Sequence, residues 1–313
     1  MANSRIDDLR MIDPVLTTVA QGYSNASMIA SKLFPIVKVS KLKGRIPVFG
    51  KEAFVVRDMQ RAMRAASNRI PPSDLELVEF ETQEKDVETA IDYIEEEETP
   101  DTARLENRIT RQLADMIELS REKEVADLVQ DGTRYDISLK NEIDAAHAFN
   151  DYTLSIDPVS IIKDGMAAVR NKIARYPNTM VIGESSYRAL VNHPQIIERI
   201  KYTGITNVNK KALAELLDIE NVFVGMAVET DDGQTFNDVW QDNIILAYVD
   251  KSEGHYRSEY NPSFGYILQR KNKPEVDSYY ENGGKIKIIR NTDNYCVKIT
   301  APDAAYLISN TNH

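Results

Sequence analysis

Two blocks of opposite charge follow one another in this chain, and a long helical pattern comes directly after them. The segment 38–70 carries nine basic and two acidic residues, and the segment 71–106 carries fourteen acidic and two basic residues. Such separation stabilises a single chain little, because exposed ion pairs contribute about 0–1 kcal/mol each. Identical copies gain more when the basic block of one copy lies on the acidic block of the next, since charge complementarity fixes register and steers association. We therefore interpret this region as an assembly arm.

Charged side chains within these blocks are the candidates for contacts between subunits. The basic candidates come from the first block, and the acidic ones come from a run of four glutamates in the second. We interpret the run as a solvated surface; the alternative is a divalent-cation site, which would use the oxygen ligands that hard cations prefer. The predicted inter-subunit contacts are Lys43, Arg45, Lys51, Arg57, Arg61, Arg64, Arg69, Glu95, Glu96 and Glu97.

The overall composition is that of a soluble globular protein. The 313 residues are 42% hydrophobic and 28% charged, and the net charge of −11 disfavours a generic nucleic-acid binder without excluding a protein that encloses nucleic acid. The single cysteine, Cys296, forbids an internal disulfide, and its strand-like neighbours predict a buried, inert thiol. We find neither a secretory signal nor the roughly 20 apolar residues that cross a membrane, and we expect assembly in a cytoplasm.

The sequence of the first 93 residues predicts an N-terminal arm followed by a long, ribbon-like β-hairpin. Residues 1–43 form an N-terminal arm with short helices, one of which begins at the cap Asp13 with Pro14 in its first turn. Helices below about 12–15 residues are marginal alone, so these must dock on the body or on a neighbour. Residues 44–93 predict a long β-hairpin. Charge on both faces argues against a core strand, so we expect a projecting hairpin supported by another subunit, the alternative being a mobile surface loop.

A single long helix is predicted over 99–131. Thr99 is the expected N-cap with Pro100 in the first turn, and Gly132 ends the pattern. At 1.5 Å per residue, about 31 residues span roughly 47 Å. Its apolar positions begin on one side and continue on another, whereas a coiled coil holds its stripe constant. We therefore expect a spine that crosses a sheet and contacts different elements along its length. The first stripe is Leu105, Ile109, Leu113 and Met116, and the second is Val125, Leu128 and Val129.

From residue 155 onward the pattern alternates between helices and strands. Asp157 caps a helix that ends before Pro177, and 179–182 is a short buried strand. Further helices are predicted at 186–192 and 210–217, and further strands at 221–224 and 243–249. After Tyr266 the chain is mainly β, and Asn282-Gly283-Gly284 predicts a hairpin turn between 276–280 and 285–289. Strands at 295–300 and 306–308 close the chain.

A search for catalytic patterns is negative. The sequence contains no glycine-rich phosphate loop and no His-Glu-x-x-His motif, and its four histidines are widely separated and predicted to lie on the surface. Ser185 and Ser186 follow Gly183 at a strand-to-helix turn, where helix capping is favoured over a nucleophile elbow. Trp240 is expected to pack beneath the strand that follows it. We predict a protein that is not an enzyme, with no catalytic, cofactor-binding or metal-binding residues.

Several short motifs follow one another along the chain: Asp13-Pro14-Val15-Leu16, Gly22-Tyr23, Leu33-Phe34-Pro35, Arg45 to Glu52, Pro177-Asn178-Thr179, Asn261 to Tyr266 and Ala301 to Ile308. In this order they resemble one group of phage coat proteins. The whole chain resembles the major capsid proteins of tailed bacteriophages, which have the Hong Kong 97-like fold. That resemblance implies an α+β fold with an N-terminal arm (1–43), an extended loop (44–93), a peripheral domain (94–154 and 271–313) containing the spine helix 99–131, and an axial domain (155–270).

The resemblance also implies a function. The chain would be a structural virion protein whose pentamers and hexamers form an icosahedral head around double-stranded DNA, assembled in the host cytoplasm with possible scaffolding, portal and cement proteins. We see no scaffolding region before Asp13, and because no motif supports covalent cross-linking between subunits, we predict that there is none. Two alternatives stay open: an encapsulin-like nanocompartment shell enclosing cargo enzymes, and an α/β enzyme using 155–270. The missing active-site constellation weighs against the second alternative.

Overall fold

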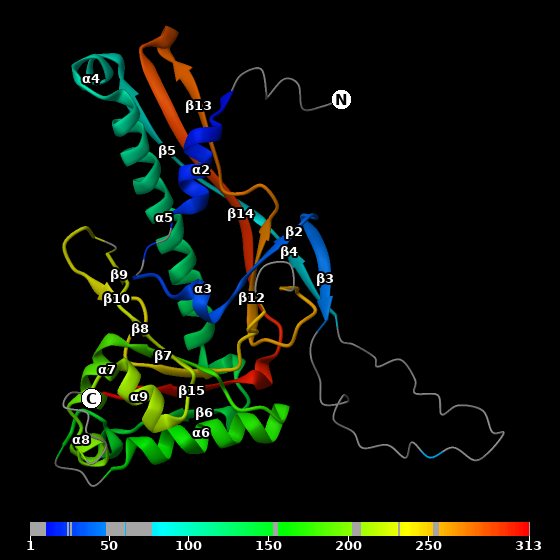
Figure 1. Cartoon of the computed structure of the whole chain (residues 1–313), viewed down its shortest axis with the longest axis vertical. Helices are drawn as coiled ribbons and strands as arrows, with labels where there is room; N and C mark the ends of the chain where they lie inside the picture. The colour runs from blue at the N-terminus through cyan, green and yellow to red at the C-terminus, as the bar shows by residue number, and fades with distance from the viewer. Residues whose placement is uncertain are drawn as a thin grey trace.

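The chain folds around two larger β-sheets joined by one long helix (Figure 1). The structure is a computed structural model. It describes residues 11–23, 25, 27–47, 60, 77–152, 156–201, 208–230, 232–252 and 257–312.

The larger sheet has six strands, with the fourteen-residue strand β14 at its centre. The start of β14 pairs with β13 and its end pairs with β12, while β5 pairs along its other side. All neighbours are antiparallel except β12 and β2. The predicted turn Asn282-Gly283-Gly284 joins β13 to β14, and all three residues have positive φ, which favours asparagine and glycine. The strands are β1 (Met11–Ile12), β2 (Ile36–Val39), β5 (Gln83–Asp92), β12 (Gly265–Arg270), β13 (Glu275–Glu281) and β14 (Ile286–Ile299).

The smaller sheet has five strands in the order β6-β15-β11-β7-β8, accompanied by four helices. Helix α6 starts as predicted, with Asp157 accepting from the backbone N–H of Val159 and proline in the first turn. Helix α8 was not predicted. The strands are β6 (Lys140–Glu142), β7 (Thr179–Gly183), β8 (Asn221–Gly225), β11 (Ile244–Ala247) and β15 (Ala305–Ser309), and the helices are α6 (Pro158–Ile173), α7 (Glu184–Val191), α8 (Pro194–Lys201) and α9 (Lys210–Leu217).

Each of the two larger sheets takes strands from more than one of the sequence ranges that we expected for the domains. The expected peripheral ranges contain β6 and β15, which pair within the five-stranded sheet. The expected axial range contains β12, which pairs with β14 in the six-stranded sheet. The 295–300 strand is also not separate, because β14 runs without interruption from Ile286 to Ile299. The chain therefore passes between the two sheets more often than its sequence pattern indicates.

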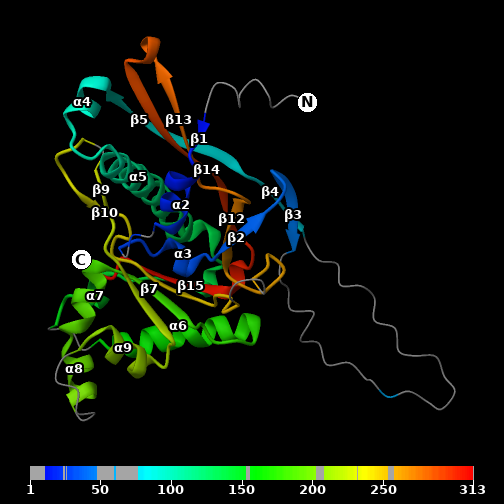
Figure 2. The ribbon, with the colours of Figure 1, turned by 45° about the horizontal axis from the view of Figure 1, so that its top comes forward.

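The ribbon prediction is corrected in its second half. Residues 83–92 do not project; they form β5, which pairs with β14 over ten residues. Among the described residues of the expected ribbon, β3 (Lys43–Pro47) and β4 (Leu77–Glu81) form a separate two-stranded ribbon, at the side of the molecule beside β2 (Figures 1 and 2). Ile46 and Phe80 are buried and pack in one cluster with Tyr266 and Leu268 of β12. The base of the ribbon is therefore supported by its own subunit.

The spine helix, α5, runs from Thr102 to Gln130. Its cap is Asp101, which accepts from the backbone N–H of Arg104 at 3.0 Å, and not Thr99 as predicted. Thr99 instead follows a separate short helix, α4 (Tyr93–Glu98). The rotating apolar face is confirmed: Leu113 packs with α2 and the six-stranded sheet, whereas Val125 and Val129 lie in a core that also contains strands of the five-stranded sheet. Met116 departs from its predicted stripe and is exposed.

The N-terminal arm lies against α5 and the six-stranded sheet. Helix α2 (Pro14–Gly22) begins at Asp13 as predicted, and its Leu16 and Ala20 are buried beside Leu113. Helix α3 (Ala30–Leu33) is followed by Phe34, which packs edge-on against Phe264. The described part of the arm thus docks on the body of its own subunit.

Two further short strands, β9 (Val228–Glu229) and β10 (Asn237–Asp238), form a hairpin beside α5 (Figure 1).

Candidate assembly surface

The β3–β4 ribbon brings the two charge blocks together within one chain. Lys43 lies opposite Glu81, and Arg45 lies opposite Glu79. Lys43 Nζ is 2.7 Å from Glu81 Oε1, while Arg45 donates to Glu79 Oε1 from Nε at 3.0 Å and from Nη2 at 2.7 Å. All four side chains are more than half exposed, so each pair contributes about 0–1 kcal/mol. At these positions the complementarity that we expected between copies is already present inside one subunit.

The other basic candidates lie on the segment that joins β3 to β4. These basic residues fall outside those that the structure describes, so their role in contacts between subunits stays a prediction. They are Lys51, Arg57, Arg61, Arg64 and Arg69.

The three acidic candidates lie in α4 and have different environments. Glu95 accepts from the backbone N–H of Asp92 at 3.2 Å and completes a capping box. Glu96 Oε1 lies 3.7 Å from Lys287 Nζ, which also donates to Glu106 of α5. Burial opposes the charge of Lys287, but the hydrogen bond from Lys287 to Glu106 raises its pKa above the ordinary value. Glu97 is exposed. Of the three, Glu97 is the residue most free to contact a neighbour.

Carboxylates on α5 hold the N-terminal arm in place, which the sequence analysis missed. Asp115 Oδ1 accepts from Tyr23 Oη at 2.7 Å and from Asn25 Nδ2 at 2.9 Å. One turn later, Glu118 Oε2 accepts from the backbone N–H of Asn25 at 3.1 Å. The hydrogen bond to Asp115 is the main reason that the pKa of Tyr23 is raised to about 12. These contacts attach the arm to the spine helix through polar groups as well as through apolar packing.

Glu122, on the next turn of α5, is fully buried and joins three parts of the fold. Its carboxylate accepts from the backbone N–H groups of Ile29, at 2.9 and 3.0 Å, and Ala30, at 2.7 Å. It also accepts from Trp240 Nε1 at 2.6 Å. Helix α3 has no side-chain cap of its own, so Glu122 satisfies its N-terminal donors. Burial raises the pKa of Glu122, although these hydrogen bonds favour the charged form. A sequence signal existed, because Glu122 shares a helix face with Val125 and Val129.

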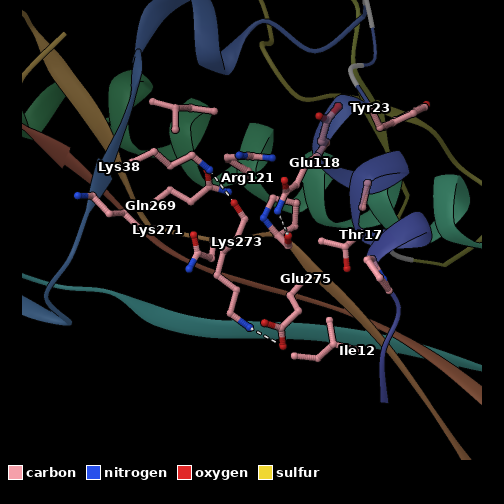
Figure 3. Close-up of a pocket in the computed structure, with 16 residues that line it drawn as sticks. Ile12, Thr17, Tyr23, Lys38, Glu118, Arg121, Gln269, Lys271, Lys273 and Glu275 are labelled. Atoms are coloured by element: carbon pink, nitrogen blue, oxygen red, sulfur yellow. Dashed lines mark hydrogen bonds and ion pairs between the residues drawn. The ribbon is translucent and has the colours of Figure 1, made fainter. Parts of the chain in front are cut away.

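A groove of about 850 Å³ lies between α2, α5, β2 and the β12–β13 connection (Figure 3). Lys38 Nζ donates to the backbone carbonyl of Lys273 at 2.6 Å and to Gln269 Oε1 at 2.5 Å. Gln269 in turn donates to the buried carboxylate of Asp293 at 2.6 and 2.8 Å. Partial burial lowers the pKa of Lys38. These contacts hold β2 against β12 and β14. The polar groups of Lys38, Gln269 and Asp293 are therefore engaged in hydrogen bonds within the fold.

The residues that the sequence analysis considered for catalysis make structural contacts in the fold. Gly183, and not a serine, is the N-cap of α7, and Ser186 is buried with its Oγ 2.6 Å from Thr311 Oγ1. His193 is buried, contrary to the surface position predicted for the histidines, and burial lowers its pKa. Within the described part of the chain, no group of three or more acidic, histidine or cysteine side chains could hold a metal ion. The helices described there are too short or too polar to cross a membrane.

Cys296 provides a first prediction. The side chain is buried as expected, and burial raises the pKa of its thiol to about 11. Because the thiolate is the reactive form, the native subunit should react with a thiol reagent at pH 8 far more slowly than the unfolded chain, whose cysteine has a pKa of about 8.5. Absorbance with a chromogenic disulfide reagent, with and without denaturant, measures both rates. Equal rates would show that the thiol is accessible in the native state.

Comparison with known proteins identifies the family. A model of the phage major capsid protein E family matches residues 33–264. The chain belongs to the phage major capsid protein E family. The major capsid protein of Burkholderia phage BcepMu is 43% identical to this capsid protein over 309 residues, which are 98% of this chain and 99% of the relative. A crystal structure of a phage-related protein from Bordetella bronchiseptica has 27% identity and a TM-score of 0.80, with 96% of this chain and 98% of that chain covered.

Structural similarity also confirms the expected fold. The capsid structure of cyanophage P-SCSP1u has a TM-score of 0.55 at 10% identity, with 93% of this chain and 92% of that chain covered. At this identity the similarity concerns the fold alone. The capsid protein therefore has the α+β Hong Kong 97-like fold that its motifs implied. As a phage major capsid protein it is a structural component of the virion.

Proposed function

We propose that the capsid protein assembles through pentamers and hexamers into an icosahedral head that encloses double-stranded DNA. The match to the phage major capsid protein E family carries this proposal, because such a protein must form a closed shell from identical copies. A closed ring arises when one surface patch binds a different patch on the next copy and the rotation closes. Scaffolding, portal and cement proteins are further proposed partners, and assembly takes place in the host cytoplasm.

The proposed ring contact uses the extended loop. Within the described residues, the β3–β4 ribbon pairs with no strand of either larger sheet, and 48–76 joins its two strands. Inside the ribbon, the exposed carboxylates of Glu81 and Glu79 already contact Lys43 and Arg45 of the same subunit. We propose that this segment lies on an acidic surface of the adjacent subunit. The peripheral domain would be built around α5 and the six-stranded sheet, and the axial domain around the five-stranded sheet.

Reversal of charge on this segment tests the ring contact. Arg61→Glu together with Arg64→Glu should leave the subunit folded but prevent assembly, because it replaces attraction by repulsion at the contact. Wild-type assembly should also depend on ionic strength, since exposed charges are screened over about 10 Å at 0.1 M salt. Negative-stain electron microscopy and sedimentation measure the particle yield. A matched control reverses the exposed pair Lys210 and Lys211 of α9.

Three outcomes separate the proposed function from its alternatives. Normal particles from the Arg61 and Arg64 variant would reject the electrostatic docking of the loop. Wild-type protein that stays monomeric at high concentration, with and without a scaffold, would reject shell formation. Particles from the native source that hold enzymes instead of DNA would favour a nanocompartment.

Because the chain is acidic, free subunits should bind duplex DNA negligibly at about 0.15 M salt, which a gel-shift assay can measure.

A further inference from the structure

The corner where α4 ends and α5 begins carries an acidic patch and a basic patch next to each other. Glu97 and Glu98, at the end of α4, are exposed. Only a short connection separates them from α5, and Figures 1 and 2 show α4 at the start of the long helix, at one end of the six-stranded sheet. We call these two glutamates, with the arginines described next, the α4–α5 corner.

The basic patch is an arginine stripe on the exposed face of α5. Arg104, Arg108 and Arg111 are exposed and follow one another at helical spacing. With Asp101, Ala103 and Asn107 they line a groove of about 560 Å³. Arg104 Nε lies 3.6 Å from Asp101 Oδ2. In the part of the chain that the structure describes, Arg108 and Arg111 have no ion-pair partner. Unpaired arginines on an otherwise acidic protein favour an anionic partner.

Exposed apolar side chains complete this corner. Tyr93 and Ile94 at the start of α4 are 44% and 49% exposed, and Tyr280 of β13 is 60% exposed. The strand register places them at the same end of the sheet, because Asp92 lies opposite Ile286 and Tyr280 lies opposite Lys287. Protein interfaces combine an apolar centre, enriched in tyrosine and arginine, with a polar rim. The corner has that composition.

The corner is also held in a defined geometry. Lys287 of β14 contacts Glu96 of α4 and Glu106 of α5 at the same time. The capping box of Asp92 and Glu95 fixes the start of α4. Both patches are therefore positioned before any partner arrives, which lowers the entropic cost of association.

We propose that the α4–α5 corner binds the same corner of a second copy across a two-fold axis. Rotation by 180° places the glutamates of each copy on the arginines of the other, so neighbouring patches of opposite charge are self-complementary. A contact around a ring would instead need its two patches on different sides of the subunit. The acidic patch beside the arginines disfavours the phosphates of nucleic acid as the partner. The proposal rests on shell formation and assigns this surface to contacts between capsomers.

Charge reversal and its rescue test this pairing. Arg108→Glu with Arg111→Glu should lower the particle yield about tenfold or more, because like charges then face one another across the axis. Adding Glu97→Arg and Glu98→Arg to the same chain should restore the yield, since the reversed patches are again complementary. The Lys210 and Lys211 reversal controls for net charge. Normal yield from the arginine variant, or no rescue by the fourfold variant, would overturn the proposal while wild-type particles still support the proposed function.

A cysteine cross-link reports the symmetry. Glu98→Cys combined with Arg104→Cys, in a chain whose native Cys296 is buried, should give disulfide-linked dimers from oxidised particles and no longer products. In a two-fold contact each copy links only to one partner, whereas a ring contact links every copy to two neighbours. A ladder of larger products, or monomers alone from well-formed particles, would contradict the two-fold contact. Loss of DNA from Arg108 and Arg111 variant particles formed in normal yield would assign the arginines to nucleic acid instead.

Discussion

Replacing Glu122 by Gln is expected to destabilise the isolated subunit by about 3 kcal/mol or more, because buried donors left without an acceptor cost about 1–3 kcal/mol each. The backbone N–H groups of Ile29 and Ala30 and the indole N–H of Trp240 all donate to this carboxylate. The side-chain amide of glutamine has only one oxygen that can accept from these three N–H donors, and its NH₂ group is itself a donor that would face them. Urea unfolding of the unassembled subunit, followed by circular dichroism, measures the change. A variant as stable as the wild type would show that water or rearrangement satisfies these donors.

Glu118 offers a matched control for this substitution. It lies on the neighbouring turn of the same helix, is only partly buried, and accepts from the backbone N–H of Asn25. Glu118→Gln keeps an acceptor within reach, so the expected cost is at most about 1 kcal/mol, the net contribution of an ordinary hydrogen bond. A loss at Glu118 as large as that at Glu122 would mean that the variants fail through general loss of negative charge on α5.

The pH dependence gives the Glu122 variant a second readout. Burial is the largest influence on the pKa of Glu122 and raises it, so the folded state holds this proton more tightly than the unfolded state. The contribution of Glu122 to the free energy of unfolding therefore falls as the pH rises from the pKa of this residue in the unfolded state to its pKa in the folded state. Nearby Arg121 favours the charged form and limits the shift. The stability difference between wild type and Glu122→Gln should decrease over that window; an increase would show that the hydrogen bonds lower the pKa overall.

Replacing Gly183 by Ala is expected to destabilise the subunit by more than about 3 kcal/mol, above the usual 1–3 kcal/mol cost of overpacking. A Cβ at this position would lie 1.8 Å from the backbone carbonyl oxygen of Gln241. Neither side can yield easily, because Gly183 ends a buried strand and caps α7, and Gln241 precedes β11. Differential scanning fluorimetry and the yield of soluble subunit measure the effect.

Gly22 provides the comparison for Gly183. It ends α2, and no heavy atom lies within 4 Å of the place where its Cβ would stand. Gly22→Ala should be neutral or stabilise slightly, since alanine in a helix is favoured over glycine by about 0.5–1 kcal/mol. If both alanine variants lost equal stability, steric contact with Gln241 would not explain the role of Gly183.

Local signals determined those parts of this protein that the sequence predicted correctly. The starts of α2 and α6 follow from Asp13 and Asp157, because a cap satisfies the helix donors next to it in the chain. The turn at Asn282-Gly283-Gly284 follows from residues that tolerate positive φ. The ordered motifs implied the Hong Kong 97-like fold and the capsid family. For the caps and the turn, the deciding interactions lie within a few residues of the chain, so the local sequence is enough to predict them.

The tertiary structure decided what depends on partners far away in the chain. The charged segment 83–92 resembles a solvated ribbon until β14 supplies its hydrogen-bond ladder, more than 190 residues later. Asp101 caps α5 in place of Thr99, which closes the separate helix α4. Glu122 appears in the sequence as one more charged residue of a helix. It becomes the junction of arm, spine and Trp240 only when three distant donors converge on one buried carboxylate, because burial makes such hydrogen bonds obligatory.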